Sequence, residues 1–207
     1  MEEKIYVVSV GPGNPDYLTP AAKSVVEQTN FLAGGARNLE LFDLAGKEVF
    51  VIRNNLAELK SFLQANINAS PAVLASGDAG YYGILKYLRA NFSEDKLKVI
   101  PGISSVQVAF ARLGDTWHDA VLFSIHGRPV EDILPLMESK KIALLTDKQN
   151  SPQALANFLI EHDHEPKEMV VLDNLSYPEE YIWRGSAAEL SRLNTNLHNS
   201  VVVIYNE

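Results

Sequence analysis

Residues 72–83 read Ala-Val-Leu-Ala-Ser-Gly-Asp-Ala-Gly-Tyr-Tyr-Gly. The first four are apolar, as in a short buried strand, and three glycines fall within positions 77–83. Glycines after a strand let the backbone approach a ligand closely, and open α/β sheets bind ligands beyond the carboxyl ends of their strands. The stretch therefore predicts an α/β fold with a binding turn. Within it, Asp78 either accepts hydrogen bonds from an amine or ribose hydroxyl, or caps the helix that follows.

A second turn, Gly11-Pro12-Gly13-Asn14-Pro15-Asp16, follows the apolar run Ile5–Val10. It begins like a dinucleotide-binding fingerprint, but Asp16 stands where the third glycine belongs. Pro12 also lacks the N–H that a phosphate cradle uses. The pattern disfavours a nucleotide phosphate and leaves two interpretations open, a rigid turn that leads into a helix and a loop that lines a cofactor.

The third turn is Pro101-Gly102-Ile103-Ser104-Ser105, where the apolar run Leu97–Ile100 leads into a helical pattern. The start of a helix offers free N–H groups, and the two serines add hydroxyls. Such an end suits a carboxylate or another polar ligand group. Simple serine capping of the helix explains the same residues equally well.

Short apolar runs alternate with helical patterns along the whole chain. Thr19-Pro20 provides an N-cap and a first helical residue, and Asn55-x-x-Glu58 resembles a capping box. We expect further helices over 81–88 and 106–113 and after Ser151-Pro152. The expected strands are Ile5–Val10, Phe31–Ala33, Val49–Ile52, Ala72–Ala75, Leu97–Ile100, Ala120–Ile125, Lys141–Thr146, Met169–Leu172, Tyr181–Trp183 and Val201–Tyr205.

This alternation predicts two α/β lobes with mostly parallel sheets that are covered on both faces. We place the boundary between the lobes near Gly114–Asp119, which gives an N-terminal lobe over residues 1–117 and a C-terminal lobe over 118–207. The three glycine-rich turns all fall in the first lobe.

Composition narrows the function classes. The 207 residues contain no cysteine, which excludes disulfides, thiolate metal sites and a cysteine nucleophile. A net charge of −8 argues against a nucleic-acid or anionic-membrane binder, which needs a basic face. The first apolar run is too short for a signal peptide or a membrane span. We therefore expect a cytoplasmic protein that acts on a small molecule.

Some other residues are candidates on local grounds. Glu161-His-Asp-His-Glu165 looks like a metal cluster, but its place at a helix end before Pro166 favours a solvated turn. His126 follows a strand and is either a functional group or an ordinary loop histidine. Arginines near strand or loop ends can bind carboxylates bidentately. These arginines are Arg37, Arg53 and Arg128.

Together, three segments resemble the tetrapyrrole (corrin/porphyrin) methylase family. Residues 8–19 are similar to its opening loop, residues 76–83 to its S-G-D-P-x-F-Y-G loop, and residues 99–105 to its next loop. Further stretches, among them 34–39 and 124–129, are similar to the family's C5-methylating corrin enzymes. Ala79 departs from the usual proline, and Gly185-Ser-Ala187 stands where G-T-L is common.

The resemblance implies S-adenosylmethionine (SAM) bound between the two lobes, no protein-bound metal, and a homodimer. It also implies a tetrapyrrole substrate and leaves room for a separate C15-methylating and decarboxylating partner. Positions carried over from the family place Pro12, Gly77, Asp78 and Ala79 on the methionine and ribose side of SAM, and Ser104 and Ser105 beside it. The positions implied for the adenine are Thr146, Asn174 and Leu175.

The implied reaction moves a methyl group from the SAM sulfonium to C5 of a corrin precursor, cobalt-precorrin-7, in cobalamin biosynthesis. The donor carries its own leaving group, so the chemistry needs alignment rather than a protein nucleophile. Asp16, Tyr82 or His126 can assist proton loss. Arg37 and Arg128 are the expected clamps for substrate carboxylates, with Arg53 and Arg112 behind them.

Two alternatives remain open at this point. The chain is either another member of the family, such as a C11 or C20 corrin methylase or diphthine synthase, or a non-enzymatic carrier of tetrapyrroles. The three intact glycine-rich turns argue against the carrier.

Overall fold

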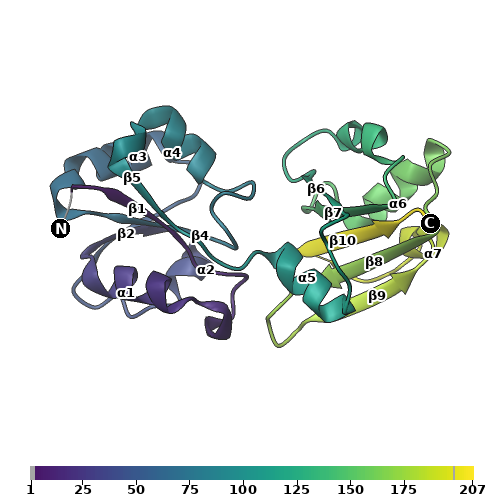
Figure 1. Ribbon diagram of the computed structural model, residues 1–207, viewed down its shortest axis with the longest axis horizontal. Coiled ribbons are helices and arrows are strands. Elements are labelled where there is room, and N and C mark those ends of the chain that lie inside the picture. The colour runs from purple at the N-terminus through teal and green to yellow at the C-terminus, as the bar shows by residue number, and fades with distance from the viewer. Residues whose placement is uncertain (1–2, 198) are drawn as a thin grey trace. The chain divides into compact units, whose positions relative to one another are not determined.

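The computed structural model describes residues 3–197 and 199–207. The chain forms two compact units, Met1–Ser104 and Ser105–Glu207 (Figure 1). The division falls before the boundary expected after residue 117, because helix α5 (Ser105–Leu113) packs against strand β10 (Ser200–Tyr205) of the second unit. The fold class, two α/β lobes, is confirmed.

The first unit contains a five-stranded sheet in the order β3-β2-β4-β1-β5. Every neighbouring pair in it is parallel. All five strands therefore end at the same edge, which we call the first carboxyl edge, and the turns that follow them start there. The strands are β1 (Ile5–Ser9), β2 (Phe31–Gly34), β3 (Glu48–Val51), β4 (Ala72–Ala75) and β5 (Leu97–Ile100).

Helices cover both faces of this sheet. Helices α1 (Pro20–Gln28) and α2 (Ala36–Leu39) lie on one face, and α3 (Leu56–Ala65) and α4 (Leu85–Asn91) on the other (Figure 1). The α1 N-terminus forms as expected, with the Thr19 hydroxyl accepting the Ala22 N–H at 3.1 Å. Short 3₁₀ helices complete the unit at Pro15–Tyr17, Ile67–Ala69 and Glu94–Lys96.

Two local expectations are wrong. Asn55 does not cap α3, because its side-chain oxygen accepts the Arg53 N–H at 2.7 Å instead. Helix α4 begins at Leu85 rather than at Tyr81, because Tyr82 has a left-handed φ of 53° that no helix accommodates. A Cβ on Gly83 would lie 2.6 Å from the Ala79 carbonyl oxygen, so the second turn is tight up to this glycine.

The second unit contains a mixed sheet in the order β6-β7-β10-β8-β9. Only β6 and β7 pair in parallel, and the other three pairs are antiparallel. The expectation of a mostly parallel sheet therefore fails for this unit. One reason is the connection 174–180 between β8 and β9, which is too short for a parallel crossover. The strands are β6 (Val121–Ser124), β7 (Lys141–Leu145), β8 (Glu168–Asp173), β9 (Tyr181–Gly185) and β10 (Ser200–Tyr205).

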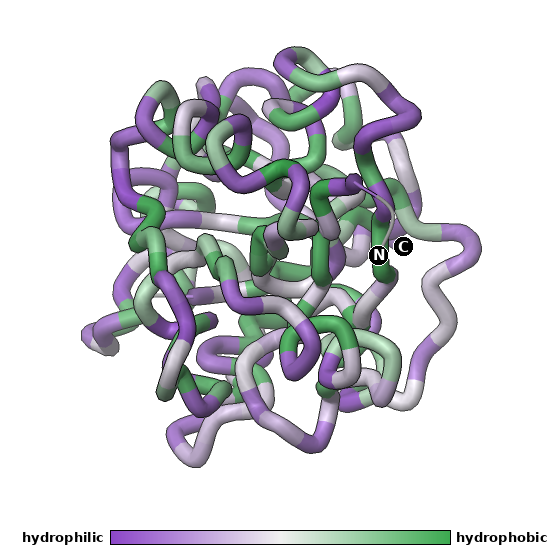
Figure 2. The backbone as a smooth tube through the Cα atoms, turned by 90° about the vertical axis from the view of Figure 1, so that its left-hand side faces the viewer, coloured by the Kyte–Doolittle hydropathy of each residue, from purple (hydrophilic) through white to green (hydrophobic). Residues whose placement is uncertain are grey.

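Helices α6 (Pro152–Glu161) and α7 (Ala187–Ser191) and the 3₁₀ segment Val130–Leu136 pack on one face of this sheet. Ser151 caps α6 as expected, accepting the Ala154 N–H. Helix α7 opens with a full capping box between Ser186 and Glu189, which our sequence analysis did not anticipate. Short hydrophobic stretches, green in Figure 2, alternate with hydrophilic ones, purple, along the backbone. Among the described residues, no helix is both long and apolar enough to cross a bilayer.

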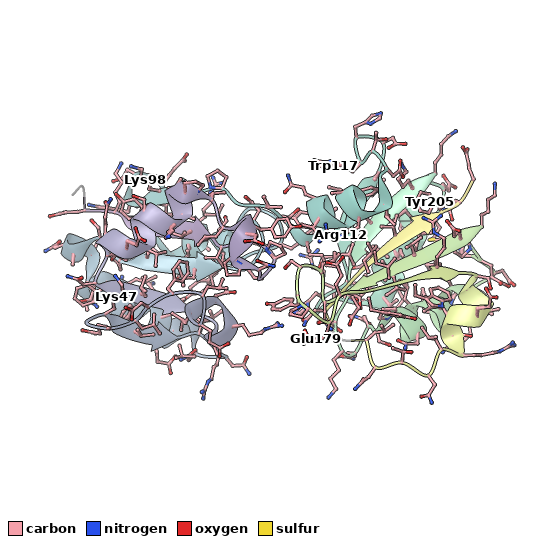
Figure 3. All side chains as sticks on the ribbon, turned by 90° about the horizontal axis from the view of Figure 1, so that it is seen from below. Lys47, Lys98, Arg112, Trp117, Glu179 and Tyr205 are labelled. Atoms are coloured by element: carbon pink, nitrogen blue, oxygen red, sulfur yellow. The ribbon has the colours of Figure 1, made fainter. Side chains whose placement is uncertain are left out.

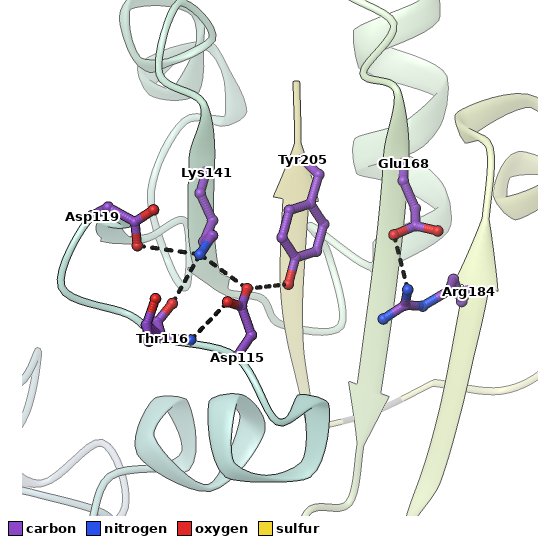
Figure 4. A network of polar contacts seen from close by, with 7 residues as sticks. All are labelled: Asp115, Thr116, Asp119, Lys141, Glu168, Arg184 and Tyr205. Atoms are coloured by element: carbon purple, nitrogen blue, oxygen red, sulfur yellow. Dashed lines mark hydrogen bonds and ion pairs between the residues drawn. The ribbon is translucent and has the colours of Figure 1, made fainter. Parts of the chain in front are cut away.

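A buried lysine joins the segment after α5 to the second sheet (Figure 4). Lys141 is 7% exposed, and its ammonium lies 2.9 Å from an Asp115 carboxylate oxygen and 3.1 Å from an Asp119 oxygen. It also donates to the Thr116 carbonyl at 2.9 Å. The Tyr205 hydroxyl donates to Asp115 at 2.9 Å. These contacts hold residues 115–119 against the first residue of β7 and the last residue of β10.

The pKa values of these groups respond to one another. Burial lowers the pKa of Lys141, but hydrogen bonds to Asp115 and Asp119 together outweigh burial, so its pKa is raised. The Lys141 hydrogen bond lowers the pKa of Asp115 and is also the main cause of the lowered pKa of Asp119. The network therefore favours the charged form of all three side chains.

Candidate functional site

The three glycine-rich turns meet at the first carboxyl edge. Gly11 and Gly77 exchange two backbone hydrogen bonds, with N···O distances of 3.2 and 2.7 Å. This pair ties the turn after β1 to the turn after β4. Both glycines have positive φ, 79° and 63°, a conformation that costs a residue with a Cβ more than it costs glycine.

Asp78 ties the second turn to the third. One carboxylate oxygen accepts the Gly80 N–H at 2.8 Å, and the other accepts the Gly102 N–H at 3.0 Å. The alternative role as a helix cap does not occur, because the N-cap of α4 is Ile84. An ionised carboxylate has about four acceptor positions, so two amides leave Asp78 able to accept from a ligand as well.

The third turn packs directly on the end of β1. A Cβ on Gly102 would lie 2.6 Å from the Ser9 Cβ and 2.9 Å from the Gly77 carbonyl oxygen. The Ser9 hydroxyl accepts the Ala79 N–H at 2.9 Å. Sequence reasoning did not single out Ser9. The available signal was a hydroxyl at the end of an otherwise apolar strand.

The remaining candidates of the first unit differ in exposure. Asp16 is exposed in the 3₁₀ segment after the first turn, and its N–H donates to the Asn14 side chain. Tyr82 is 42% exposed, and its ring meets the Tyr81 ring edge-on at 5.0 Å. Ser104 is buried, and Pro12 is partly exposed in the first turn.

Two of the expected clamp arginines belong to the same edge. Arg37 lies in α2, directly after β2, and Arg53 lies just after β3. Both are exposed. Because β2 and β3 are parallel to β4 and β1, these arginines follow strands that end at the edge where the three turns meet.

The adenine candidates gather at one edge of the second sheet. Thr146 follows β7, and its hydroxyl donates to the Ser200 carbonyl at 3.0 Å. Asn174 follows β8, has a φ of 48°, and accepts from the Asn199 side chain at 3.3 Å. Leu175 beside it is 3% exposed. The structure thus brings Thr146 and Asn174 together through the residues that begin β10. Ser105 opens α5 in the same unit.

Asp173 organises this second edge, a role that sequence reasoning missed. It is 3% exposed and accepts the Ser200 hydroxyl at 2.6 Å and the Asn199 N–H at 3.0 Å through one oxygen. Its other oxygen accepts from the Asn174 side chain at 2.9 Å. The sequence signal that could have indicated this role was an acidic residue at the end of an otherwise apolar strand.

The loop that carries His126 and Arg128 is held by two residues after β7. Asp147 accepts the Gly127 N–H at 2.6 Å, and the Asn150 side chain donates to the Arg128 carbonyl at 2.9 Å. Burial raises the pKa of Asp147, but the backbone hydrogen bonds from Asn150, Gly127 and Gln149 outweigh burial, so its pKa is lowered. His126 is exposed on this loop.

The other arginine candidates have protein contacts. The Arg128 guanidinium lies 5.9 Å from the centre of the Phe123 ring. Arg112, on α5 (Figure 3), forms a bidentate pair with Glu180, at 2.5 and 3.2 Å. This guanidinium lowers the pKa of Glu180. Arg112 is therefore a structural residue of the second unit and a poor substrate clamp.

The Glu161–Glu165 segment forms a helix end. His162 Nδ1 lies 2.8 Å from the Phe158 carbonyl oxygen, and the His162 ring packs on the Phe158 ring. In the part of the chain that the structure describes, no group of three or more histidines and carboxylates is arranged to hold a metal ion.

Around Asp78, the second turn suits a cationic ligand group better than an anionic one. The amides of Gly77, Ala79 and Gly80 are hydrogen bonded within the turns, and Pro12 has none to offer. Asp78, with two of its acceptor positions used, can still accept from a ligand. A sulfonium and an amino group fit this set of partners, whereas a phosphate does not.

Comparison with known proteins agrees with this chemistry. Cobalt-precorrin-7 C(5)-methyltransferase of Salmonella typhimurium is 35% identical over 97% of this chain and 98% of its own. A precorrin-6Y methylase of Archaeoglobus fulgidus has the same fold, with a TM-score of 0.77 at 24% identity and 99% coverage of both chains. Uroporphyrin-III C-methyl transferase of Thermus thermophilus, complexed with S-adenyl homocysteine, matches with a TM-score of 0.79 at 16% identity, over 98% of this chain and 92% of that one. Residues 4–191 match the pattern of the Tetrapyrrole (Corrin/Porphyrin) Methylases, and the chain belongs to that family.

Proposed function

We propose that this protein is a SAM-dependent methyltransferase that methylates C5 of cobalt-precorrin-7 in cobalamin biosynthesis. The proposal depends on one observation: hydrogen bonds of Gly11, Gly77, Asp78 and Gly102 join three turns that are remote in the sequence. The relative from Salmonella typhimurium, which carries the name of this activity and matches over nearly the full length, supports the choice of reaction.

Each unit has its own part in binding. Pro12, Gly77, Asp78 and Ala79 line the methionine and ribose side of SAM, and the first unit also receives the tetrapyrrole. The second unit holds the adenine through Thr146, Asn174 and Leu175. Ser104 and Ser105, at the junction of the two units, contact the cofactor from the third turn.

Bound SAM supplies a methyl group on a positively charged sulfur. The task of the protein is to align the substrate carbon, the methyl group and the sulfur, with reacting atoms about 3–3.5 Å apart. Burial of the donor away from water favours the reaction, because water stabilises the charged sulfonium. Asp16, Tyr82 or His126 accepts the proton that the ring loses after methylation.

The direct test is transfer of ¹³C-methyl from labelled SAM to cobalt-precorrin-7, followed by NMR of the product. We expect one new methyl signal at C5. A methyl group at another ring carbon, such as C11 or C20, would identify another corrin methylase. Transfer to a modified histidine of a protein instead of to this substrate would identify a diphthine synthase. Tetrapyrrole binding without any transfer would indicate the carrier.

Replacing Asp78 by Asn should weaken SAM binding by roughly 10- to 30-fold, because the amide keeps one accepting oxygen and loses the other. Calorimetric titration measures the affinity, and circular dichroism shows whether the variant is folded. Asp95→Asn, which changes an exposed carboxylate of the same unit before β5, is the matched control for charge. Equal affinities for Asp78→Asn and wild type would remove Asp78 from the cofactor site.

Arg37→Ala should weaken cobalt-precorrin-7 binding by about 10-fold and leave the SAM affinity unchanged. Arg37 is exposed, so its attraction to a substrate carboxylate is screened, and the loss is smaller than for a buried pair. Equilibrium binding of each ligand measures the two effects separately. Arg89→Ala, an exposed arginine of α4, is the control. If Arg37→Ala binds the tetrapyrrole like wild type, Arg37 is not a clamp. Arg128 is the second proposed clamp and is tested in the same way.

Membership of the family supports a proposal about the oligomeric state, the metal content and the partners. We propose a cytoplasmic homodimer that needs no protein-bound metal and works beside a separate C15-methylating and decarboxylating protein. Sedimentation analysis of the purified chain tests the dimer, and co-purification with a C15-methylase tests the partner.

A further inference from the structure

Ser9 is a fully buried serine at the first carboxyl edge, where β1 ends. Strand β1 pairs with β4 on one side and with β5 on the other. Its last residue therefore lies between the turns that follow those two strands. The side chains of Ile5 and Val7, on the same face, belong to the apolar core. Ser9 is 0% exposed at the position where this alternation calls for an apolar residue.

The hydroxyl of Ser9 has one clear structural partner. It accepts the Ala79 N–H at 2.9 Å, and Ala79 itself is 1% exposed in the same core. A buried amide without an acceptor is costly, so Ser9 determines where the second turn crosses the end of β1. Neighbouring Asp78 and Gly80 move with Ala79, because the three residues are consecutive.

Ser9 also contacts the third turn. The Cβ position of Gly102 falls 2.6 Å from the Ser9 Cβ and 3.0 Å from the Ser9 carbonyl oxygen, so the two backbones are in close contact. The same Gly102 donates to Asp78 at 3.0 Å. One side chain thus contacts both of the turns that Asp78 bridges.

We propose that Ser9 is a positioning residue for the cofactor: it places the Asp78 carboxylate and the second turn where SAM binds. The proposal rests on the proposed function. Ser9 lies beneath the turns and does not contact the reacting atoms. Its loss should therefore weaken SAM binding and leave the methyl transfer step intact once SAM is bound.

The test is Ser9→Ala, which removes the hydroxyl and adds no bulk. We expect the dissociation constant and the KM for SAM to rise by roughly 5- to 150-fold, with kcat at saturating SAM within about 2-fold of wild type. In hydrogen exchange, the amides of Ala79, Gly80 and Gly102 should lose protection, while the strand amides of β2 keep theirs.

Thr29→Val is the matched control. Thr29 is 2% exposed in the same unit, before β2, and its hydroxyl donates to the Ser70 carbonyl at 3.0 Å. This variant loses a buried hydrogen bond before β2 and β4, at the sheet edge opposite the three turns, so it should be destabilised without a change in SAM affinity. Equal losses of SAM affinity in both variants would show a general effect of stability and overturn the proposal.

The remaining outcomes are distinct. Wild-type SAM affinity in Ser9→Ala, or a fall in kcat with an unchanged KM, would overturn the positioning role and leave the proposed function standing. A wild-type protein that binds no SAM would contradict the proposed function, and the role of Ser9 with it.

Discussion

Gly102→Ala should lower SAM affinity by at least about 100-fold, the largest loss that we expect from a single methyl group. The added Cβ would lie 2.6 Å from the Ser9 Cβ, 2.9 Å from the Gly77 carbonyl oxygen and 3.0 Å from the Ser9 carbonyl oxygen. Two of these three neighbours are backbone atoms, so no side-chain rotation relieves the clash. The third turn must move away from β1, which breaks the 3.0 Å hydrogen bond from Gly102 to Asp78. A factor of 100 corresponds to about 2.7 kcal/mol, within the usual cost of overpacking.

Calorimetric titration with SAM measures this effect, and the thermal midpoint shows whether the variant remains folded. Gly35→Ala is the control, because nothing lies within 4 Å of its Cβ position and Gly35 also follows a strand at this edge. We expect that variant to bind SAM like wild type. If Gly102→Ala kept the wild-type affinity in a folded protein, the close contact of the three turns would have no part in cofactor binding.

Lys141→Met should destabilise the second unit by about 2–4 kcal/mol. Removal of one partner from a buried ion pair leaves the other charge poorly compensated. The Lys141 side chain is 9% exposed, but Asp115 and Asp119 are more accessible to water, which keeps the expected loss below the upper limit for such pairs. Urea unfolding measures the change. Lys140→Met is the matched control: it removes an exposed ion pair with Glu207 and should cost less than about 1 kcal/mol.

The same network predicts a pH dependence. The pKa of Asp115 is lowered in the folded protein, so its contribution to stability is present above the unfolded pKa of about 3.9 and is lost as the pH falls through the folded value. The pKa of Lys141 is raised, so its contribution is present below about 10.4 and is lost as the pH rises through the folded value. The difference between wild type and Lys141→Met should therefore be constant from pH 5 to 9 and shrink below about pH 4. A difference that stays unchanged at pH 3 would contradict the ion-pair explanation.

Local sequence patterns predicted the first unit well. The bounds of β4 and β5 and the Thr19-Pro20 start of α1 agree with the structure, because apolar runs, caps and proline act over a few residues. The start of α4 was wrong, because Tyr81 fits the helical pattern and nothing local shows that Tyr82 has positive φ. The prediction that the strands of the second sheet are mostly parallel was also wrong. Strand direction depends on which distant segments pair, and local patterns do not show this.

The site was predictable in part. Glycine clustering pointed to the three turns, and the structure brings them together. The hydrogen bonds that join them were not predictable, because Ser9 and Asp78 act on amides that are 70 and 24 residues away. Arg112 was a reasonable clamp from its residue type, and only the structure shows its pairing with Glu180.

The place of β10 in the middle of the second sheet, between β7 and β8, affects how the protein is made. On the ribosome, every strand of the first sheet has been synthesised by residue 100, so that sheet can form during translation. The second sheet can form only after its central strand, the last of its five strands in the sequence, has been synthesised. A nascent chain stalled before residue 200 would carry the apolar edges of β7 and β8 unpaired, as a target for chaperones or aggregation.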